Sequence, residues 1–238
     1  MVMPMITAKH SKIKSGIFNI YLNRLLKKRF ASLHLFGDIP ALNNEWPLIL
    51  FANHNTWWDG FFLLILNQLF LHRKMYMMML EKQLMVYSFF RGIGAFGIRK
   101  GNAGDIKKTL QYCADILKEQ NTVLCIFPQG ELQEWNRRPV IFERGLLYII
   151  KSAPKPVYLL PLAMRPEFLE EERAQVFFRF GSLHSFDENS PAASIEKYAS
   201  ELETLMRQTE REIADGNRGR IIFKGKKSVS KVIEELKT

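Results

Sequence analysis

The chain has 238 residues, 47% of them hydrophobic, and carries a formal net charge of +10 at pH 7. This length suits one α/β domain with a sizeable core, and the apolar runs are shorter than the roughly 20 residues that a transmembrane helix needs. The charge calls for an anionic partner, but the absence of zinc-finger spacing, an RNA-binding aromatic motif or a continuous basic helix excludes the common nucleic-acid-binding classes.

The N-terminal segment, residues 1–32, is basic and lacks the apolar core and cleavage site of a signal peptide. Residues 16–30 have the spacing of an amphipathic helix. One face carries Phe18, Tyr21, Leu22, Leu25 and Leu26, and the other carries mostly Asn19, Asn23, Arg24, Lys27 and Lys28. Such a helix can lie among the headgroups of an anionic membrane, or its apolar face can cover the domain core, or it can do both.

The middle of the chain, residues 33–217, alternates between strand-like and helix-like patterns. The strand-like runs lie near residues 33–36, 47–52, 75–80, 96–99, 122–127, 156–163 and 175–180. The helix-like runs cover residues 60–66, 103–120 and 143–152, and a last one extends from an N-cap at Ser190-Pro191 to near Gly216. This order predicts an α/β fold with a largely parallel central sheet flanked by helices. A second basic cluster follows in the C-terminal tail, residues 218–238.

Two cysteines, Cys113 and Cys125, lie on the inward side of a predicted helix and within a predicted strand. They form no disulfide framework, and we expect both to pack in the core. No Gly-x-Gly-x-x-Gly or Walker-type loop is present, which argues against a bound nucleotide cofactor. No metal site is expected either.

The connection between the strand that ends at Ala52 and the helix that opens at Gly60 carries His54 and Asp59. A histidine in a loop at a strand end can accept a proton from a substrate near neutral pH. An aspartate close by can hold the imidazole in one tautomer and stabilise its charged form. Because no serine lies in a Gly-x-Ser-x-Gly elbow, we expect His54 to act on the substrate's own hydroxyl. In the alternative interpretation, Asp59 is only a helix N-cap and His54 only a hydrogen-bonded histidine.

Residues 53–60, Asn-His-Asn-Thr-Trp-Trp-Asp-Gly, resemble the first signature block of the glycerolipid acyltransferase superfamily, which includes the 1-acylglycerol-3-phosphate acyltransferases. In that family the histidine is the general base and the aspartate its partner. Three further blocks follow in the family's order. They are residues 94–101, a glycine-containing strand that ends in basic residues, then residues 127–131, Phe-Pro-Gln-Gly-Glu, and then residues 157–164, a hydrophobic strand with a proline. The resemblance spans about residues 33–182.

The resemblance implies an enzyme that moves a fatty acyl group from acyl-CoA or acyl carrier protein to the hydroxyl of a lysophospholipid-type or other lipid alcohol. His54 and Asp59 would be its catalytic residues, and no cofactor besides the acyl co-substrate is implied. The residues expected to bind substrate are Arg99, Lys100, Phe127, Pro128, Gln129, Gly130 and Glu131. Because Pro128 has no amide hydrogen, the main-chain amides of Gln129 and Gly130 are the candidates to stabilise the oxyanion.

The expected partners are an anionic membrane surface, the acyl donor and the lipid acceptor, which predicts a cytoplasmic protein that is peripheral on the inner face of the membrane. Two other functions remain open at this point, a thioesterase-like hydrolase that uses the same residues on water and a non-catalytic lipid-binding relative.

The third block departs from the family's pattern, because Gln129 replaces a glutamate and Leu132 replaces an arginine. In the family that charged pair is associated with the glycerol phosphate acceptor, so we expect altered acceptor use.

Overall fold

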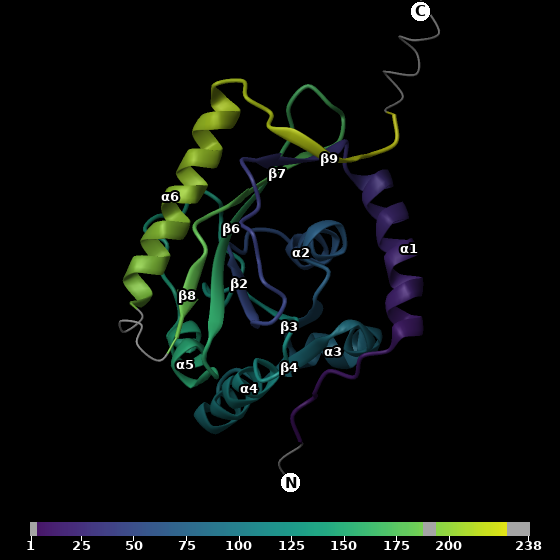
Figure 1. Cartoon of the computed structure of the whole chain (residues 1–238). Coiled ribbons are helices and arrows are strands. Elements are labelled where there is room, and N and C mark those ends of the chain that lie inside the picture. Colours follow the sequence, from purple (N-terminus) through teal and green to yellow (C-terminus); the bar gives the residue numbers. More distant parts are fainter. Residues whose placement is uncertain (1–3, 188–193, 228–238) are drawn as a thin grey trace, which may run out of the picture.

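A computed structural model describes residues 4–187 and 194–227, and within these residues nine strands form one sheet with helices on both faces (Figure 1). The strand order is β4-β3-β5-β2-β6-β7-β1-β9, with β8 paired to β6. The strands are β1 (Ser32–Phe36), β2 (Leu48–Ala52), β3 (Lys74–Leu80), β4 (Ala95–Ile98), β5 (Thr122–Ile126), β6 (Val157–Glu167), β7 (Gln175–Phe180), β8 (His184–Phe186) and β9 (Arg220–Lys224). The helices are α1 (Lys12–Arg29), α2 (Asp59–Leu66), the π-helix η1 (Asn67–Leu71), α3 (Glu81–Val86), the 3₁₀-helix η2 (Ser88–Ile93), α4 (Ala103–Ile116), α5 (Gly145–Ser152) and α6 (Ile195–Ala214).

The centre of the sheet is parallel, as the alternating order of elements predicted. The neighbours from β4 to β6 in the strand order all pair in parallel, and so do β1 and β7. The antiparallel pairs are β6 with β7, β6 with β8, and β1 with β9. Each predicted strand region contains an observed strand. The sequence pattern did not identify β8, which has only three residues, or β9, which lies in the predicted basic tail.

Successive side chains of the central strands enter two different cores, because neighbouring residues of a strand point to opposite faces of the sheet. In β2, Leu48 and Leu50 belong to the core beneath α1 and α2. Ile49 and Phe51 belong to the core beneath α4, α5 and α6. The predicted arrangement with helices on both faces is therefore confirmed. Cys113 and Cys125 are both buried, and burial raises the pKa of each thiol. This agrees with the packing role predicted for them.

The N-terminal helix is present, but its inward face differs from the prediction at one position. Phe18, Leu22 and Leu26 pack into the core. Tyr21 was predicted to share that face, yet 53% of its surface is exposed. The buried residues recur every four positions, whereas Tyr21 is turned away from them by about 60–140° at the helical period of roughly 100° per residue. None of the helices in the described residues combines the length and the apolar character of a membrane span.

Both ends of the described chain add to the same fold. Before α1, the main chain crosses the edge strand β4, where the Gly97 amide donates to the Ile6 carbonyl at 2.8 Å. After α6, β9 pairs antiparallel with β1, and the Gly225 amide donates to the Ala31 carbonyl at 2.8 Å. The predicted cap of the last helix, residues 190–191, lies outside the described residues, and the structure caps α6 with Ser194 instead.

Candidate active site

The candidate site lies where neighbouring strands of the parallel sheet end. β2 ends at Ala52 and continues into residues 53–58, while β5 ends at Ile126 and continues into residues 127–133. Because β2 and β5 are parallel neighbours, both loops leave the sheet at the same edge. The carboxyl ends of strands in open α/β sheets are the usual place for ligand sites. The fold thus joins the first and third sequence blocks, which are about 70 residues apart in the chain.

Asp59 is the first residue of α2, and its side chain is 1% exposed. Its Oδ2 accepts hydrogen bonds from the amides of Asn55 and Thr56 at 2.8 and 2.9 Å. Its Oδ1 accepts from the Thr56 hydroxyl at 2.6 Å. A buried carboxylate is costly unless hydrogen-bond donors surround it, and this loop supplies them. The carboxylate is therefore fixed toward the loop that precedes the helix and does not cap α2.

His54 meets this carboxylate with its Nδ1 atom, 2.8 Å from Asp59 Oδ2. Since an ionised carboxylate can only accept, Nδ1 carries the proton and donates it, which leaves Nε2 as the acceptor. The Phe127 ring stacks on the imidazole with centroids 4.1 Å apart and planes inclined by 13°. The His54 side chain stays 25% exposed. Such a geometry would allow the imidazole to act as a base that the aspartate orients.

The loop after β5 holds the main chain of His54 on both sides. The Gln129 side-chain oxygen accepts from the His54 amide at 2.7 Å, and the Gln133 amide donates to the His54 carbonyl at 2.9 Å. The two glutamine side chains also bond to each other, with Gln129 Nε2 donating to Gln133 Oε1 at 2.8 Å. Gln129 is buried. Its oxygen and its nitrogen therefore both serve to position the loop that carries His54.

Two asparagines add further support beneath His54. The buried Asn53 extends the pairing of β2 with β6, because its side chain accepts from the Met164 amide at 2.8 Å and donates to the Met164 carbonyl at 2.9 Å. The Asn55 side chain donates to the Gln133 carbonyl at 2.6 Å. Sequence reasoning did not single out Asn53, Asn55, Thr56 or Gln133. For the first three, a signal exists in the tendency of Asn and Thr to bond nearby main-chain groups, but Gln133 gave no such signal.

Gly130 forms the turn of the loop after β5 with a φ of +75°, in the region that favours glycine. Its amide donates to the Phe127 carbonyl at 3.0 Å. Of the two amides predicted to stabilise an oxyanion, this one is thus engaged within the loop. The Gly130 carbonyl accepts from Lys100 Nζ, which brings the basic end of the second block to the third. The Pro128 carbonyl accepts from the Glu143 amide at 2.7 Å, and this bond links the loop to the chain before α5.

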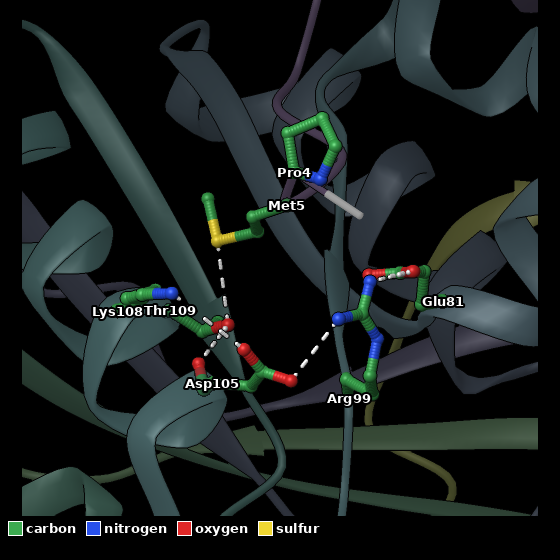
Figure 2. Close-up of a pocket in the computed structure, with 7 residues that line it drawn as sticks. All are labelled: Pro4, Met5, Glu81, Arg99, Asp105, Lys108 and Thr109. Carbon is green, nitrogen blue, oxygen red and sulfur yellow. Dashed lines mark hydrogen bonds and ion pairs between the residues drawn. The ribbon is translucent and has the colours of Figure 1, made fainter. Parts of the chain in front are cut away.

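Arg99 belongs to a different cluster from Lys100, although both were predicted to bind substrate. Its guanidinium forms ion pairs with Glu81 and with Asp105, the latter at 3.0 Å. The hydrogen bond to Glu81, followed by that to Asp105, raises the pKa of Arg99. Figure 2 shows these side chains around a small cavity of about 190 Å³, into which Met5 also points. This cavity is a separate feature from the loops that hold His54.

The rest of the third block faces solvent. Glu131 is exposed, and its nearest charged partner is Arg137 at 3.8 Å. Leu132, which stands in place of the family's arginine, is 53% exposed. An exposed leucine beside this polar loop brings apolar surface to the position where the family's pattern has an arginine. The structure thus unites His54, Asp59, Lys100, Phe127, Gln129 and Gly130 in one group of contacts.

Comparison with known proteins identifies a family and related folds. A family model described as Acyltransferase matches residues 36–165, more than half of the chain. Among solved structures, the chain is similar in fold to the 1-acyl-sn-glycerophosphate acyltransferase PlsC from Thermotoga maritima, with a TM-score of 0.58 and 18% sequence identity over 85% of this chain and 79% of that one. No curated protein sequence matches significantly. The resemblance seen in the sequence blocks is therefore confirmed at the level of family and fold.

Proposed function

The chain belongs to the acyltransferase family, and we propose that it moves a fatty acyl group from acyl-CoA or acyl carrier protein to the hydroxyl of a lysophospholipid-type or other lipid alcohol. The observation that carries this proposal is the contact of 2.8 Å between His54 Nδ1 and the buried carboxylate of Asp59. It leaves Nε2 to accept a proton from the acceptor hydroxyl. No cofactor besides the acyl co-substrate enters the proposed reaction.

In the proposed reaction, His54 Nε2 takes the hydroxyl proton while the acceptor oxygen attacks the thioester carbonyl. The tetrahedral intermediate then collapses, its carbon–sulfur bond breaks, and the leaving thiolate takes the proton back from His54. Asp59 stabilises the imidazolium that exists between the two steps. Because the Gly130 amide is already bonded, the Gln129 amide is the donor that we propose for the oxyanion.

For the place of action, we propose the inner face of a membrane, with the protein bound peripherally. The net charge of +10 supports this, because the cytoplasmic leaflet is the negatively charged one. Lys100 is the cation proposed to attract a phosphate near the reacting groups, since it already contacts the loop at Gly130.

The proposal can be tested by supplying labelled acyl-CoA or acyl carrier protein with a panel of lipid alcohols. We expect acylated lipid, and we expect His54→Ala to lower its rate by at least about 10²-fold with the fold unchanged. Asp59→Asn should also be severely impaired, because an amide stabilises an imidazolium poorly. Free fatty acid as the main product would indicate a hydrolase, and no product with any donor would indicate a lipid-binding relative.

The acceptor is the second part of the proposal. Gln129 and Leu132 replace the charged pair of the family, and the Gln129 side chain is occupied by His54 and Gln133. Loss of a fork from arginine to phosphate costs about 1.5–3 kcal/mol, or about ten- to hundredfold in specificity. We therefore propose weak use of lysophosphatidate relative to acceptors that lack a phosphate beside the hydroxyl.

Leu132→Arg tests this acceptor preference with little risk to the fold, because Leu132 is exposed. We expect it to raise the rate with lysophosphatidate relative to phosphate-free acceptors, and Leu132→Gln serves as the uncharged control. Gln129→Glu forces Gln133 to turn its amide so that it donates, and should be tolerated only if that rotation occurs. A wild type that already prefers lysophosphatidate would show that another cation holds the phosphate.

A further inference from the structure

Gln133 is bonded to the residues around His54 through each of its polar groups except the side-chain nitrogen. Its amide donates to the His54 carbonyl at 2.9 Å, and its carbonyl accepts from Asn55 Nδ2 at 2.6 Å. Its side-chain oxygen accepts from Gln129 Nε2 at 2.8 Å. Within the part of the chain that the structure describes, no group accepts from Gln133 Nε2, and this atom is not buried. It is therefore a donor that is open to a ligand.

The Gln129 side chain decides which end of the Gln133 side chain is left open. The main-chain N–H of His54 can only donate, so the end of Gln129 that it meets at 2.7 Å is the oxygen. The other end of Gln129 is then its NH₂ group, which has to meet an oxygen of Gln133. A glutamate at position 129 would accept at both ends and would turn the Gln133 amide round. Residue 129 thus sets whether Gln133 presents a donor or an acceptor.

The surroundings of His54 define the side from which a substrate can approach. Asp59 faces Nδ1, and Phe127 stacks on one face of the imidazole. Nε2 must therefore be reached from the part of the side chain that stays 25% exposed. Gln133 contacts the same histidine and is likewise only half-buried. A substrate hydroxyl at Nε2 thus brings its neighbouring atoms toward the loop that presents the Gln133 NH₂ group.

We propose that Gln133 Nε2 donates a hydrogen bond to an ether or ester oxygen that lies beside the reacting hydroxyl of the lipid acceptor. This contact rests on the acyl transfer proposed above. An ether or ester oxygen can only accept, so it is complementary to an NH₂ group and not to a carbonyl or a carboxylate. Gln133 then determines specificity, because it favours glycerol-type alcohols over simple alkanols. Gln129 acts through Gln133, as the positioning residue that keeps the donor outward.

The test uses two acceptors that differ in one atom, the monohexadecyl ether of ethylene glycol and nonadecanol, the alkanol of equal chain length. Each is supplied with labelled acyl-CoA or acyl carrier protein, and kcat/KM is measured for both. Both acceptors use the same base, so the ratio of the two values cancels any change in His54 itself. We expect the wild type to favour the ether by about three- to tenfold, the range for a neutral hydrogen bond.

Gln133→Glu keeps an oxygen for Gln129 Nε2 and replaces the outward NH₂ group by a second oxygen. The preference for the ether should disappear or reverse, while kcat/KM with nonadecanol stays within about threefold of the wild type. Gln129→Glu should have the same effect on the ratio, because it turns the Gln133 carbonyl outward. Gln111→Glu is the matched control, since Gln111 is exposed on α4 and should leave the ratio unchanged.

Lysophosphatidate serves as a third acceptor, because a phosphate oxygen also accepts hydrogen bonds. A loss in Gln133→Glu that is confined to lysophosphatidate would place the phosphate at Gln133 and overturn the assignment to the ether or ester oxygen. An equal loss with all acceptors would reduce Gln133 to a support of His54. Acylation of both alcohols with an unchanged ratio would remove this contact and leave the proposed reaction standing. If no acceptor is acylated with any donor, the proposed reaction itself fails, and this contact fails with it.

Discussion

At the scale of single residues, His54 is positioned by groups from both loops at the sheet edge. Asp59 fixes its imidazole, Phe127 covers one side of the ring, and Gln129 and Gln133 hold its main chain. The contact between His54 and Asp59 could be predicted because both residues lie in one short connection. The contacts of His54 with Gln129 and Gln133 could not, since they depend on the pairing of β2 with β5.

Thr56 gives a test of this positioning that leaves His54 and Asp59 in place. Thr56→Val removes the hydroxyl that donates to Asp59 Oδ1 at 2.6 Å and keeps a similar volume. Hydrogen bonds to charged groups are worth about 1.5–3 kcal/mol, so we expect kcat to fall by about ten- to hundredfold. Thr56→Ser, which keeps the hydroxyl, should restore most of the rate. If the valine and serine variants turn over equally, the hydroxyl has no part in orienting the carboxylate.

At the scale of elements, α6 anchors the long connection between the candidate active site and α5. Glu203 in α6 accepts from the Val140 amide at 2.9 Å and from Arg207 at 2.8 Å, and lies 3.9 Å from Arg138. The bond from Val140, followed by that from Arg207, lowers the pKa of the Glu203 carboxyl. A group whose pKa is lowered by folding stabilises the protein above its unfolded pKa. That contribution is lost as the pH falls through the folded pKa.

Glu203→Gln should therefore reduce stability most clearly at neutral pH. We expect a loss of about 0.5–1 kcal/mol at pH 7, the range for partly exposed charged contacts. The difference in unfolding free energy between wild type and variant should disappear as the pH falls below about 4, where the wild-type carboxyl becomes protonated and loses its charge. Urea denaturation at a series of pH values measures both. If the difference in unfolding free energy stays constant with pH, the loss of stability arises from the changed side-chain shape and not from the lost charge.

The elements that sequence patterns predicted are the periodic ones. α4 and α6 carry apolar residues at clear helical spacing, and β2 and β5 are almost entirely apolar and fully buried. The pair α3 and η2 was missed, because apolar residues follow one another from Leu84 to Tyr87 without helical spacing. The structure supplies the reason, since the side chains of Met85, Val86 and Tyr87 point to solvent and not to the core.

At the scale of the whole molecule, no sequence pattern indicated that the segment after β9 contacts the C-terminal end of α1 beside β1. After β9, the Gly225 amide donates to Ala31, and the Lys226 amide donates to the Lys27 carbonyl at the end of α1 at 2.8 Å. Arg173 joins the same place, with donated bonds to the carbonyls of Lys27 and Lys226. Alternating elements predict a parallel sheet, but strand order and end contacts arise from pairings far apart in sequence. Residues predicted as N-terminal and C-terminal segments therefore share one structure.

Two glycine substitutions distinguish the effect of the contact between Gly225 and the end of α1 from a general change in the stability of that helix. A Cβ at Gly225 would lie 2.0 Å from the Phe30 carbonyl oxygen, so Gly225→Ala should push β9 away from α1. We expect a loss of about 2 kcal/mol, or about 4–8 °C in Tm. Gly16 in α1 has open space around it, and Gly16→Ala should instead stabilise by about 0.5–1 kcal/mol. A Gly225→Ala variant that melts at the wild-type temperature would show that the end contact is dispensable.

The position of β1 also sets an order of events during synthesis. Within the described residues, β1 pairs only with β7 and β9. This strand is synthesised near the start of the chain, long before the two strands with which it pairs. Contacts of such long sequence separation slow folding, because closing a large loop costs conformational entropy before the strand pairing contributes favourable free energy. The strands from β2 to β6 can assemble earlier, with α1 packed against α2 and η2, while β1 remains without its partners. The nascent chain thus carries an unpaired strand until late, in the period when aggregation or capture by a chaperone competes with folding.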